Sequence, residues 1–168
     1  MTDFEALYER YAPHVRRFAL FLAGDPSLAD DITSETFVRA WTTPGKIRQE
    51  TVKAYLFTIA RNLYHDSLHR SRRLAALHDD IRDNKADAQK RAEDFSELKF
   101  VLAEMQRLPE IDRAALLMRA QDQMSYEEIS QALNLSLSAV KVKIHRARLK
   151  LMRSTRTRSA QSSRWEGP

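Results

Sequence analysis

The sequence predicts an all-α fold of two small helical domains joined by a charged linker. Three glycines and five prolines in 168 residues are too few for a turn-rich β fold, and abundant Leu, Ala, Arg and Glu favour helices. Apolar residues recur at three- and four-residue spacings in two separate stretches, as in amphipathic helices. We therefore expect residues 1–75 to form one domain, 76–96 the linker, 97–155 the second domain and 156–168 a polar tail.

The first domain is predicted to contain three amphipathic helices. The first covers residues 4–22, with Asp3 as a cap, and Pro13 inside it predicts a kink or two abutting helices. A turn at residues 24–27 precedes a second helix. Thr51 could cap a third helix that runs to Arg73. The buried side of the second helix is expected to hold Leu28, Ile32, Phe37 and Trp41.

The linker is marked by loss of the apolar period and by its charge. Residues 79–97 carry seven acidic and four basic side chains, which favours a solvated segment. The apolar period resumes at Leu98 in a helix that ends near Leu108, and Pro109 suits the first turn of the next helix.

Residues 125–151 carry the pattern of a helix-turn-helix, so we expect the C-terminal domain to contain one. Ser125 and Glu128 have the spacing of a capping box. Asn134 follows the short helix where the chain must turn, and asparagine tolerates the left-handed conformation. Ser136 can cap the helix that follows.

That following helix has an apolar back and a basic front, the pattern of a recognition helix in the major groove. The stripe of Val140, Ile144, Ala147 and Leu151 would hold it in place. Arg146 could pair with a guanine edge and Val142 could contact a thymine methyl group. The alternative is an ordinary solvated basic face. The candidate DNA-binding residues are Ser138, Lys141, Val142, Lys143, His145, Arg146 and Arg148.

The charge distribution also suggests a polyanionic partner. The net charge is +5, and the basic residues gather in residues 51–78 and 136–168, on either side of the acidic stretch. The chain has no cysteine, which excludes disulfides and thiolate metal sites. It has no apolar run long enough to span a bilayer and no signal-peptide pattern at its start, so we expect a cytoplasmic protein without membrane insertion.

Residues 4–153 resemble the ECF (extracytoplasmic function) sigma factors of the sigma-70 superfamily. Residues 125–148 are similar to the family's C-terminal helix-turn-helix, including its Arg-Ala-Arg ending. Residues 30–41 resemble the segment that docks on the polymerase clamp, and residues 55–62 with the arginines that follow resemble the helix that engages the −10 promoter element. Two residues depart from the pattern: Ser34 stands where glutamine is common and Asn134 where glycine is common.

The resemblance implies a transcription initiation factor that is not an enzyme and needs no cofactor. Its implied partners are bacterial RNA polymerase core, promoter DNA at the −35 and −10 elements, and an anti-sigma factor. The residues that the resemblance implies in polymerase binding are Asp31, Ser34 and Glu35. The residues implied at the −10 element are Lys53, Arg61, Asn62, Arg70, Arg72 and Arg73, beside a base pocket in residues 43–49. Tyr55 and Tyr64 could stack on bases or pack in the core.

Two other functions remain to be weighed. A conventional helix-turn-helix regulator would bind duplex DNA without polymerase, but residues 1–75 have no strand pattern or glycine-rich loop for a ligand domain. A metalloenzyme is suggested by His65 and His69, four residues apart on one helix. Asp66 stands where that motif needs glutamate, and only His78 offers a third ligand, so histidines on a nucleic-acid face are the favoured interpretation.

Overall fold

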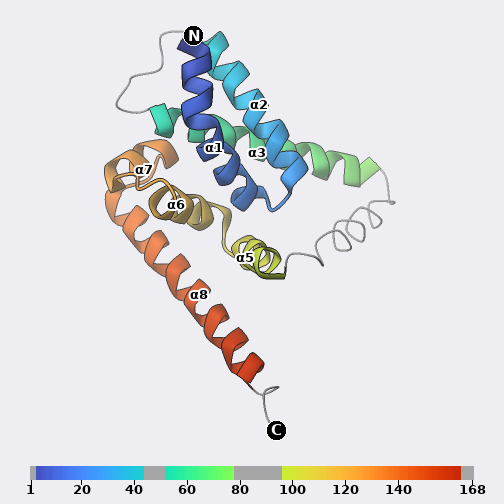
Figure 1. Cartoon of the computed structure of the whole chain (residues 1–168), viewed down its shortest axis with the longest axis vertical. Coiled ribbons are helices and arrows are strands. Elements are labelled where there is room, and N and C mark those ends of the chain that lie inside the picture. Colours follow the sequence, from blue (N-terminus) through green and yellow to red (C-terminus); the bar gives the residue numbers. More distant parts are fainter. Residues whose placement is uncertain (1–2, 44–51, 78–95, 164–168) are drawn as a thin grey trace.

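The computed structural model of the chain describes residues 3–43, 52–77 and 96–163, and they are helical throughout apart from short turns. The N-terminal half contains α1 (Asp3–Ala23), α2 (Pro26–Thr42) and α3 (Val52–Leu77). The C-terminal half contains α5 (Ser96–Gln106), α6 (Glu110–Ala120), α7 (Tyr126–Leu133) and α8 (Leu137–Ser163), as Figure 1 shows. The all-α prediction is confirmed. Of the predicted linker, residues 78–95 lie outside the described residues.

Helices α1, α2 and α3 form a three-helix unit around a buried aromatic pair. The rings of Phe18 and Phe57 stack with their centroids 4.6 Å apart. Asp25 caps α2 by accepting hydrogen bonds from the first backbone N–H groups of that helix. Two threonines face this core, and each donates its hydroxyl hydrogen to a carbonyl oxygen one turn earlier. The polar groups of Thr33 and Thr36 are thus satisfied although both residues are buried.

Two expectations for this unit are corrected. Pro13 lies inside one continuous α1, so the chain does not form two abutting helices there. Proline removes one backbone hydrogen bond, and the packing of α1 against α2 and α3 compensates for that loss. Trp41 is 54% exposed and packs edge-on against Phe4, whereas Phe37 is buried as expected.

The C-terminal unit contains the predicted helix-turn-helix. Ser125 and Glu128 form both hydrogen bonds of the capping box, at 3.1 and 2.9 Å. Asn134 adopts the left-handed conformation, with φ 53° and ψ 50°, and turns the chain into α8. Ser136 accepts a hydrogen bond from the backbone of Ala139 at the start of that helix. The predicted stripe is also confirmed: Val140, Ile144 and Ala147 are buried and Leu151 is half-buried.

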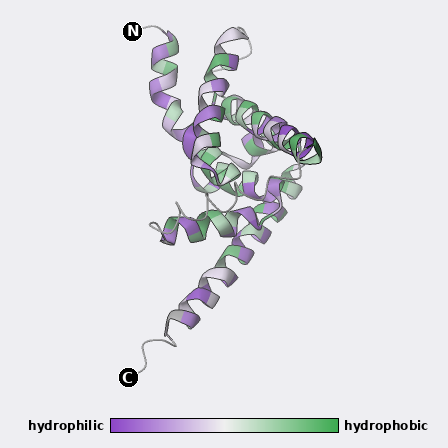
Figure 2. Ribbon diagram, turned by 90° about the vertical axis from the view of Figure 1, so that its right-hand side faces the viewer, coloured by the Kyte–Doolittle hydropathy of each residue, from purple (hydrophilic) through white to green (hydrophobic). Residues whose placement is uncertain are grey.

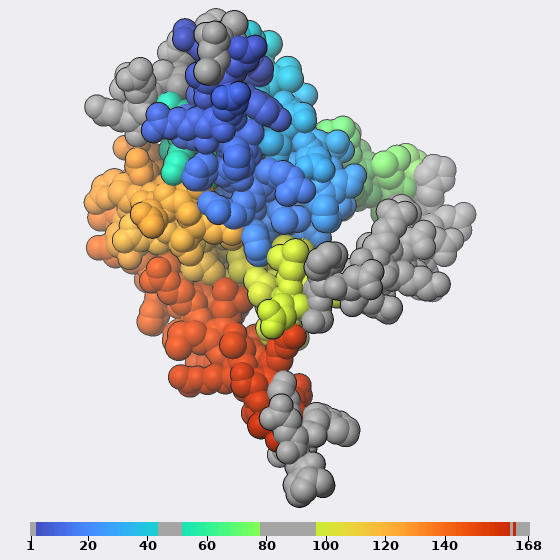
Figure 3. Space-filling view, viewed as in Figure 1, coloured from blue at the N-terminus to red at the C-terminus, as the bar shows by residue number. Residues whose placement is uncertain are grey.

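The two units pack directly on each other, which the sequence did not lead us to expect. Helix α1 contacts α5 and α6, and α3 contacts α7. The buried apolar side chains of both halves form one continuous cluster. Figure 3 shows the N-terminal helices seated on the C-terminal unit, with the far part of α8 projecting away. Helices α1 and α3 of the N-terminal unit and α5, α6 and α7 of the C-terminal unit therefore form the contact between the units.

We predict that Asn134→Gly is neutral or slightly stabilising, whereas Asn134→Ala destabilises the protein by about 1 kcal/mol. The left-handed backbone at this position is free of strain only for glycine, and alanine lacks the side-chain amide that helps asparagine to tolerate it. Thermal unfolding followed by circular dichroism measures both effects, with a fall of about 2–4 °C expected for alanine. Equal melting temperatures for the two variants would contradict this reading of the turn.

Candidate nucleic-acid and polymerase interfaces

Helix α8 exposes a strip of side chains suited to contacts with DNA. Ser138, Val142, His145 and Arg148 are all exposed, and Val142 is 58% accessible although it is apolar. The helix carries eight Lys or Arg residues and no acidic residue from Leu137 to Ser163. Hydrophilic residues recur along its projecting part (Figure 2). An exposed apolar side chain within a basic face suits the mixture of methyl groups and phosphates in a major groove.

Arg146 has a protein partner within the C-terminal unit. Its guanidinium donates to both carboxylate oxygens of Asp112 on α6, at 2.9 and 3.2 Å. Lys143 Nζ lies 3.6 Å from the same carboxylate, whose side chain is fully buried. The hydrogen bonds that Arg146 donates to the Asp112 carboxylate raise the pKa of Arg146 above its ordinary value. Arg146 and Lys143 therefore tie α8 to α6, and Arg146 retains about half of its surface for other contacts.

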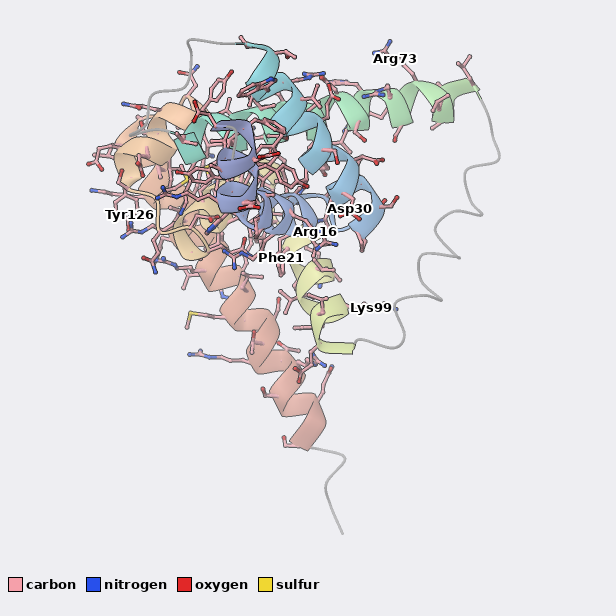
Figure 4. All side chains as sticks on the ribbon, turned by 45° about the horizontal axis from the view of Figure 1, so that its top comes forward. Arg16, Phe21, Asp30, Arg73, Lys99 and Tyr126 are labelled. Atoms are coloured by element: carbon pink, nitrogen blue, oxygen red, sulfur yellow. The ribbon has the colours of Figure 1, made fainter. Side chains whose placement is uncertain are left out.

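The sequence analysis did not identify Asp112 as a partner of α8, although the sequence contains an indication of this role. It is an acidic residue inside the apolar face of α6, beside Ile111 and two positions before Ala114. A buried acid in a basic protein requires a cationic partner. A second partner of α8 lies on α7, where Lys141 Nζ is 5.6 Å from the ring centre of Tyr126. Figure 4 places Tyr126 at the outer edge of that unit.

The predicted −10 residues of α3 fall into two groups. Asn62, Arg70, Arg72 and Arg73 are exposed, and Figure 4 shows Arg73 near the free end of α3. Arg61 instead faces the C-terminal unit, and Lys53 lines a hollow of about 360 Å³ together with residues of α1 and α7 and of the loop before α7. The guanidinium of Arg61 donates to both oxygens of Glu110 on α6, at 2.7 and 2.8 Å.

The two tyrosines that could have stacked on bases contribute to packing. Tyr64 is buried, and its hydroxyl accepts a hydrogen bond from Arg113 at 3.3 Å. Tyr55 is half-buried and packs against the core. Residues 44–49 of the expected base pocket lie outside the described residues.

The residues predicted to bind polymerase line one groove between α2 and α3. Asp31, Ser34 and Glu35 are exposed on the same side of α2, above Arg70 and Leu74 of α3. The groove has a volume of about 730 Å³. Glu35 also pairs with Arg39 one turn later, at 3.2 Å. Val38, on the same face of α2, is 52% exposed, so the groove combines carboxylates with apolar surface.

The histidine pair of the metalloenzyme hypothesis is also located. His65 Nε2 lies 3.4 Å from Glu110, beside the Arg61 contact, and His69 is exposed further along α3. Within residues 3–43, 52–77 and 96–163, no group of three or more His, Asp or Glu side chains could hold a metal ion. His78 lies outside the described residues. No helix in the described parts of the chain has the length and apolar character needed to cross a membrane.

Comparison with known families gives two matches that follow the two helical units. The model described as Sigma-70 region 2 matches residues 7–74, which span α1 to α3. The model described as Sigma-70, region 4 matches residues 101–151, which span α5 to the middle of α8.

Two relatives match over most of this chain. The chain is 31% identical over 149 residues to the ECF RNA polymerase sigma factor SigM of Bacillus subtilis, covering 88% of this chain and 91% of the relative. It is 30% identical over 156 residues to the ECF RNA polymerase sigma factor SigE of Mycolicibacterium smegmatis, covering 90% of this chain but 61% of the relative.

Solved structures share the arrangement of helices. The sigma factor RpoE from Bartonella quintana, in complex with the anti-sigma factor NepR, matches with a TM-score of 0.72 at 19% identity, over 93% of this chain and 98% of that one, which supports the fold alone. CnrH, in complex with the cytosolic domain of CnrY, matches with a TM-score of 0.69 at 28% identity, over 92% of this chain and 88% of that one. With its two sigma-70 regions and its near full-length likeness to SigM, the chain belongs to the ECF family of RNA polymerase sigma factors.

Proposed function

We propose that this chain directs RNA polymerase core to promoters that carry a −35 and a −10 element and that it promotes melting at the second. The observation that carries the proposal is the presence of two exposed basic helices, α3 and α8, in one chain with a groove between α2 and α3 that exposes the carboxylates of Asp31 and Glu35. As a sigma factor it would contribute binding and no catalysis of its own, and it would need no cofactor. A cytoplasmic location follows from its work with polymerase.

At the −35 element, the exposed face of α8 would enter the major groove. Val142 is the candidate for contact with a thymine methyl group, and Ser138 and His145 offer hydrogen bonds to base edges. Arg148 and Lys141 lie at the sides, where phosphates fix the register. The contacts of Arg146 and Lys143 with Asp112 support a different role for these two, in which they set the angle of the helix on the DNA.

At the −10 element, α3 would supply backbone contacts through Arg70, Arg72 and Arg73. These arginines are exposed over the last part of the helix, where no described acidic residue is paired with them. Arg61, Asn62 and Lys53 would lie nearer the melted bases. Extruding a base costs a few kcal/mol, so positive charge beside the opened strand is needed to stabilise it.

The groove between α2 and α3 would bind polymerase core. Carboxylates of Asp31 and Glu35 suit a basic surface, and exposed Val38 adds apolar area at the centre of the contact. Because core binding brings both DNA-binding helices to one promoter, the two weak contacts act at a high effective concentration. An anti-sigma partner is also proposed, since the similar structures of RpoE and CnrH are complexes with such a protein or with the cytosolic domain of CnrY.

The promoter-directing role predicts that sequence selection requires polymerase. A pool of duplexes with randomised promoter sequence, incubated with the chain and bacterial core, should yield bound DNA enriched in two motifs at a fixed spacing. The chain without core should enrich neither motif. Enrichment of one duplex motif by the chain alone would contradict the proposal and favour a conventional helix-turn-helix regulator.

The role of Arg146 is tested by comparing two variants against the enriched −35 motif. If Arg146 positions the helix through Asp112, then Asp112→Asn and Arg146→Ala both lower specificity by about tenfold and spread the loss over every position of the motif. If Arg146 reads a base, only Arg146→Ala acts, and it relaxes a single position. Binding of holoenzyme to single-substitution duplexes distinguishes these patterns, and Arg148→Ala, which should weaken all sequences equally, is the control.

If the groove between α2 and α3 binds polymerase, Glu35→Arg should weaken the affinity for core by about tenfold or more. The substitution replaces an attraction to a basic surface of core by repulsion. The matched control is Glu9→Arg, the same charge change at an exposed position of α1. Titration of labelled chain with core, followed by fluorescence anisotropy, gives both affinities. An equal loss in the two variants would mean that net charge, and not this groove, determines binding.

A further inference from the structure

The side of α3 that packs in the core continues beyond the point where the core ends. Leu63 is buried on that side. Steps of four, three and four residues from Leu63 lead to Ser67, Arg70 and Leu74, which therefore lie on the same side of the helix. None of the α3 residues after Tyr64 is buried, and Figure 1 shows this part of the helix extending past α2. The end of α3 thus exposes a side that its first half uses for packing.

This exposed continuation forms the second wall of the groove whose first wall is α2. Arg70 and Leu74 line the groove from α3, and Val38 lines it from α2. The two apolar side chains among these are 54% and 52% exposed. At 1.5 Å per residue, the lining residues from Leu63 to Leu74 extend over roughly 16 Å of α3, which is about three turns. A groove of that length accommodates a short stretch of a partner helix.

The two walls of the groove expose opposite charges. The α2 wall carries the carboxylates of Asp31 and Glu35, and the α3 wall carries the guanidinium of Arg70. No ion pair joins the walls within the described residues, and Glu35 pairs instead with Arg39 of its own helix at 3.2 Å. Both side chains of that pair are about half exposed, so the pair contributes little and a partner can replace it.

We propose that α3 supplies the second half of the polymerase-binding site, where Arg70 contacts a carboxylate of core and Leu74 contacts apolar surface. The partner that fits is an amphipathic helix of core. It has basic residues along the edge that meets Asp31 and Glu35, apolar residues along its centre and an acidic residue along the edge that meets α3. The inference rests on the proposed function, because it takes the groove to be the place where core binds.

Opposite charges on the two walls explain how so exposed a groove binds its partner in one orientation. Carboxylates alone, such as those of Asp31 and Glu35, attract any basic surface. With Arg70 on the facing wall, a partner in the reversed orientation would place its acidic edge against α2 and its basic edge against α3. Like charges across an interface disfavour that alternative, so Arg70 determines orientation as well as affinity. Leu74 and Val38 supply the apolar area between the charges.

The first experiment measures the affinity of the full-length chain for core in the absence of DNA. The sequence has no cysteine, so Gln131→Cys at an exposed position of α7 carries a fluorescein label for anisotropy. In this labelled chain, Arg70→Glu should weaken the affinity for core about tenfold, because it repels the acidic edge of the partner.

The matched control is Arg72→Glu, the same charge change two residues away. Arg72 is exposed but lies about 200° around the helix from Arg70 and outside the groove. Arg72→Glu should leave the affinity for core unchanged and lower only the binding of holoenzyme to promoter DNA. An equal loss of affinity for core in the two variants overturns the proposal.

An exchange of charges between the walls tests the orientation of the partner. Glu35→Arg combined with Arg70→Glu keeps the net charge of the chain but reverses the polarity of the groove. The double variant should bind core at least as weakly as either single variant, because both edges of the partner then meet like charge. Recovery of affinity overturns the proposal, since net charge or a direct contact between Glu35 and Arg70 would then account for the single variants.

The apolar part of the contact has its own pair of variants. Leu74→Ala should weaken the affinity for core about fivefold, because it removes apolar area from the centre of the contact. Leu77→Ala should have no effect, since Leu77 is 76% exposed and does not line the groove. Equal affinities of the two variants contradict the role of Leu74.

Comparison with Glu35→Arg separates this inference from the function on which it rests. Loss of core binding in Glu35→Arg but not in Arg70→Glu removes α3 from the polymerase site and leaves the role of α2 intact. Loss in neither variant removes the whole groove from polymerase binding, and the proposed function then fails together with the inference.

Discussion

Two adjacent buried residues of α6, Asp112 and Arg113, have opposite charges, and each binds a different helix. The arrangement of the chain depends on their burial. Asp112 is fully buried and holds Arg146 and Lys143 of α8, whereas Arg113 is buried against Tyr64 of α3. Burial lowers the pKa of Arg113 below its ordinary value, because the charged guanidinium loses contact with water there. A charge in such surroundings costs several kcal/mol unless partners surround it, so neither helix can move away without a penalty.

This role of α6 explains why a short helix of eleven residues can determine where the two basic helices α3 and α8 lie. Its N-terminal Glu110 pairs with α3, its buried Asp112 fixes α8, and Asp122 just beyond its end binds α1. The apolar clusters of the two units are small and continuous with each other. Hydrophobic contact is not directional, so the paired charges select one arrangement from the many that would bury similar areas.

The sequence was sufficient for the local structure of the C-terminal unit, because capping and turn chemistry are local. Ser125, Glu128 and Asn134 act through backbone groups within a few residues, and the predicted geometry is present. It was insufficient where a side chain meets a helix distant in sequence. Arg61 and Arg146 belong to basic patterns typical of DNA contact, and nothing near them in the chain indicates Glu110 or Asp112. The prediction that Trp41 is buried was wrong for a related reason: its partner Phe4 is distant in sequence and leaves half of the Trp41 side chain exposed.

The paired charges of α6 fix how the two units sit on each other, and the distance between the units in the free chain tests this most directly. Donor and acceptor dyes on cysteines introduced at two exposed positions, Ala6 of α1 and Gln131 of α7, would report that distance. The account predicts high energy transfer in this labelled chain and lower transfer after Glu110→Lys, but no change after Glu97→Lys at an exposed position of α5. Unchanged transfer after Glu110→Lys would contradict it, because the pair of Arg61 and Glu110 would then not hold the two units together.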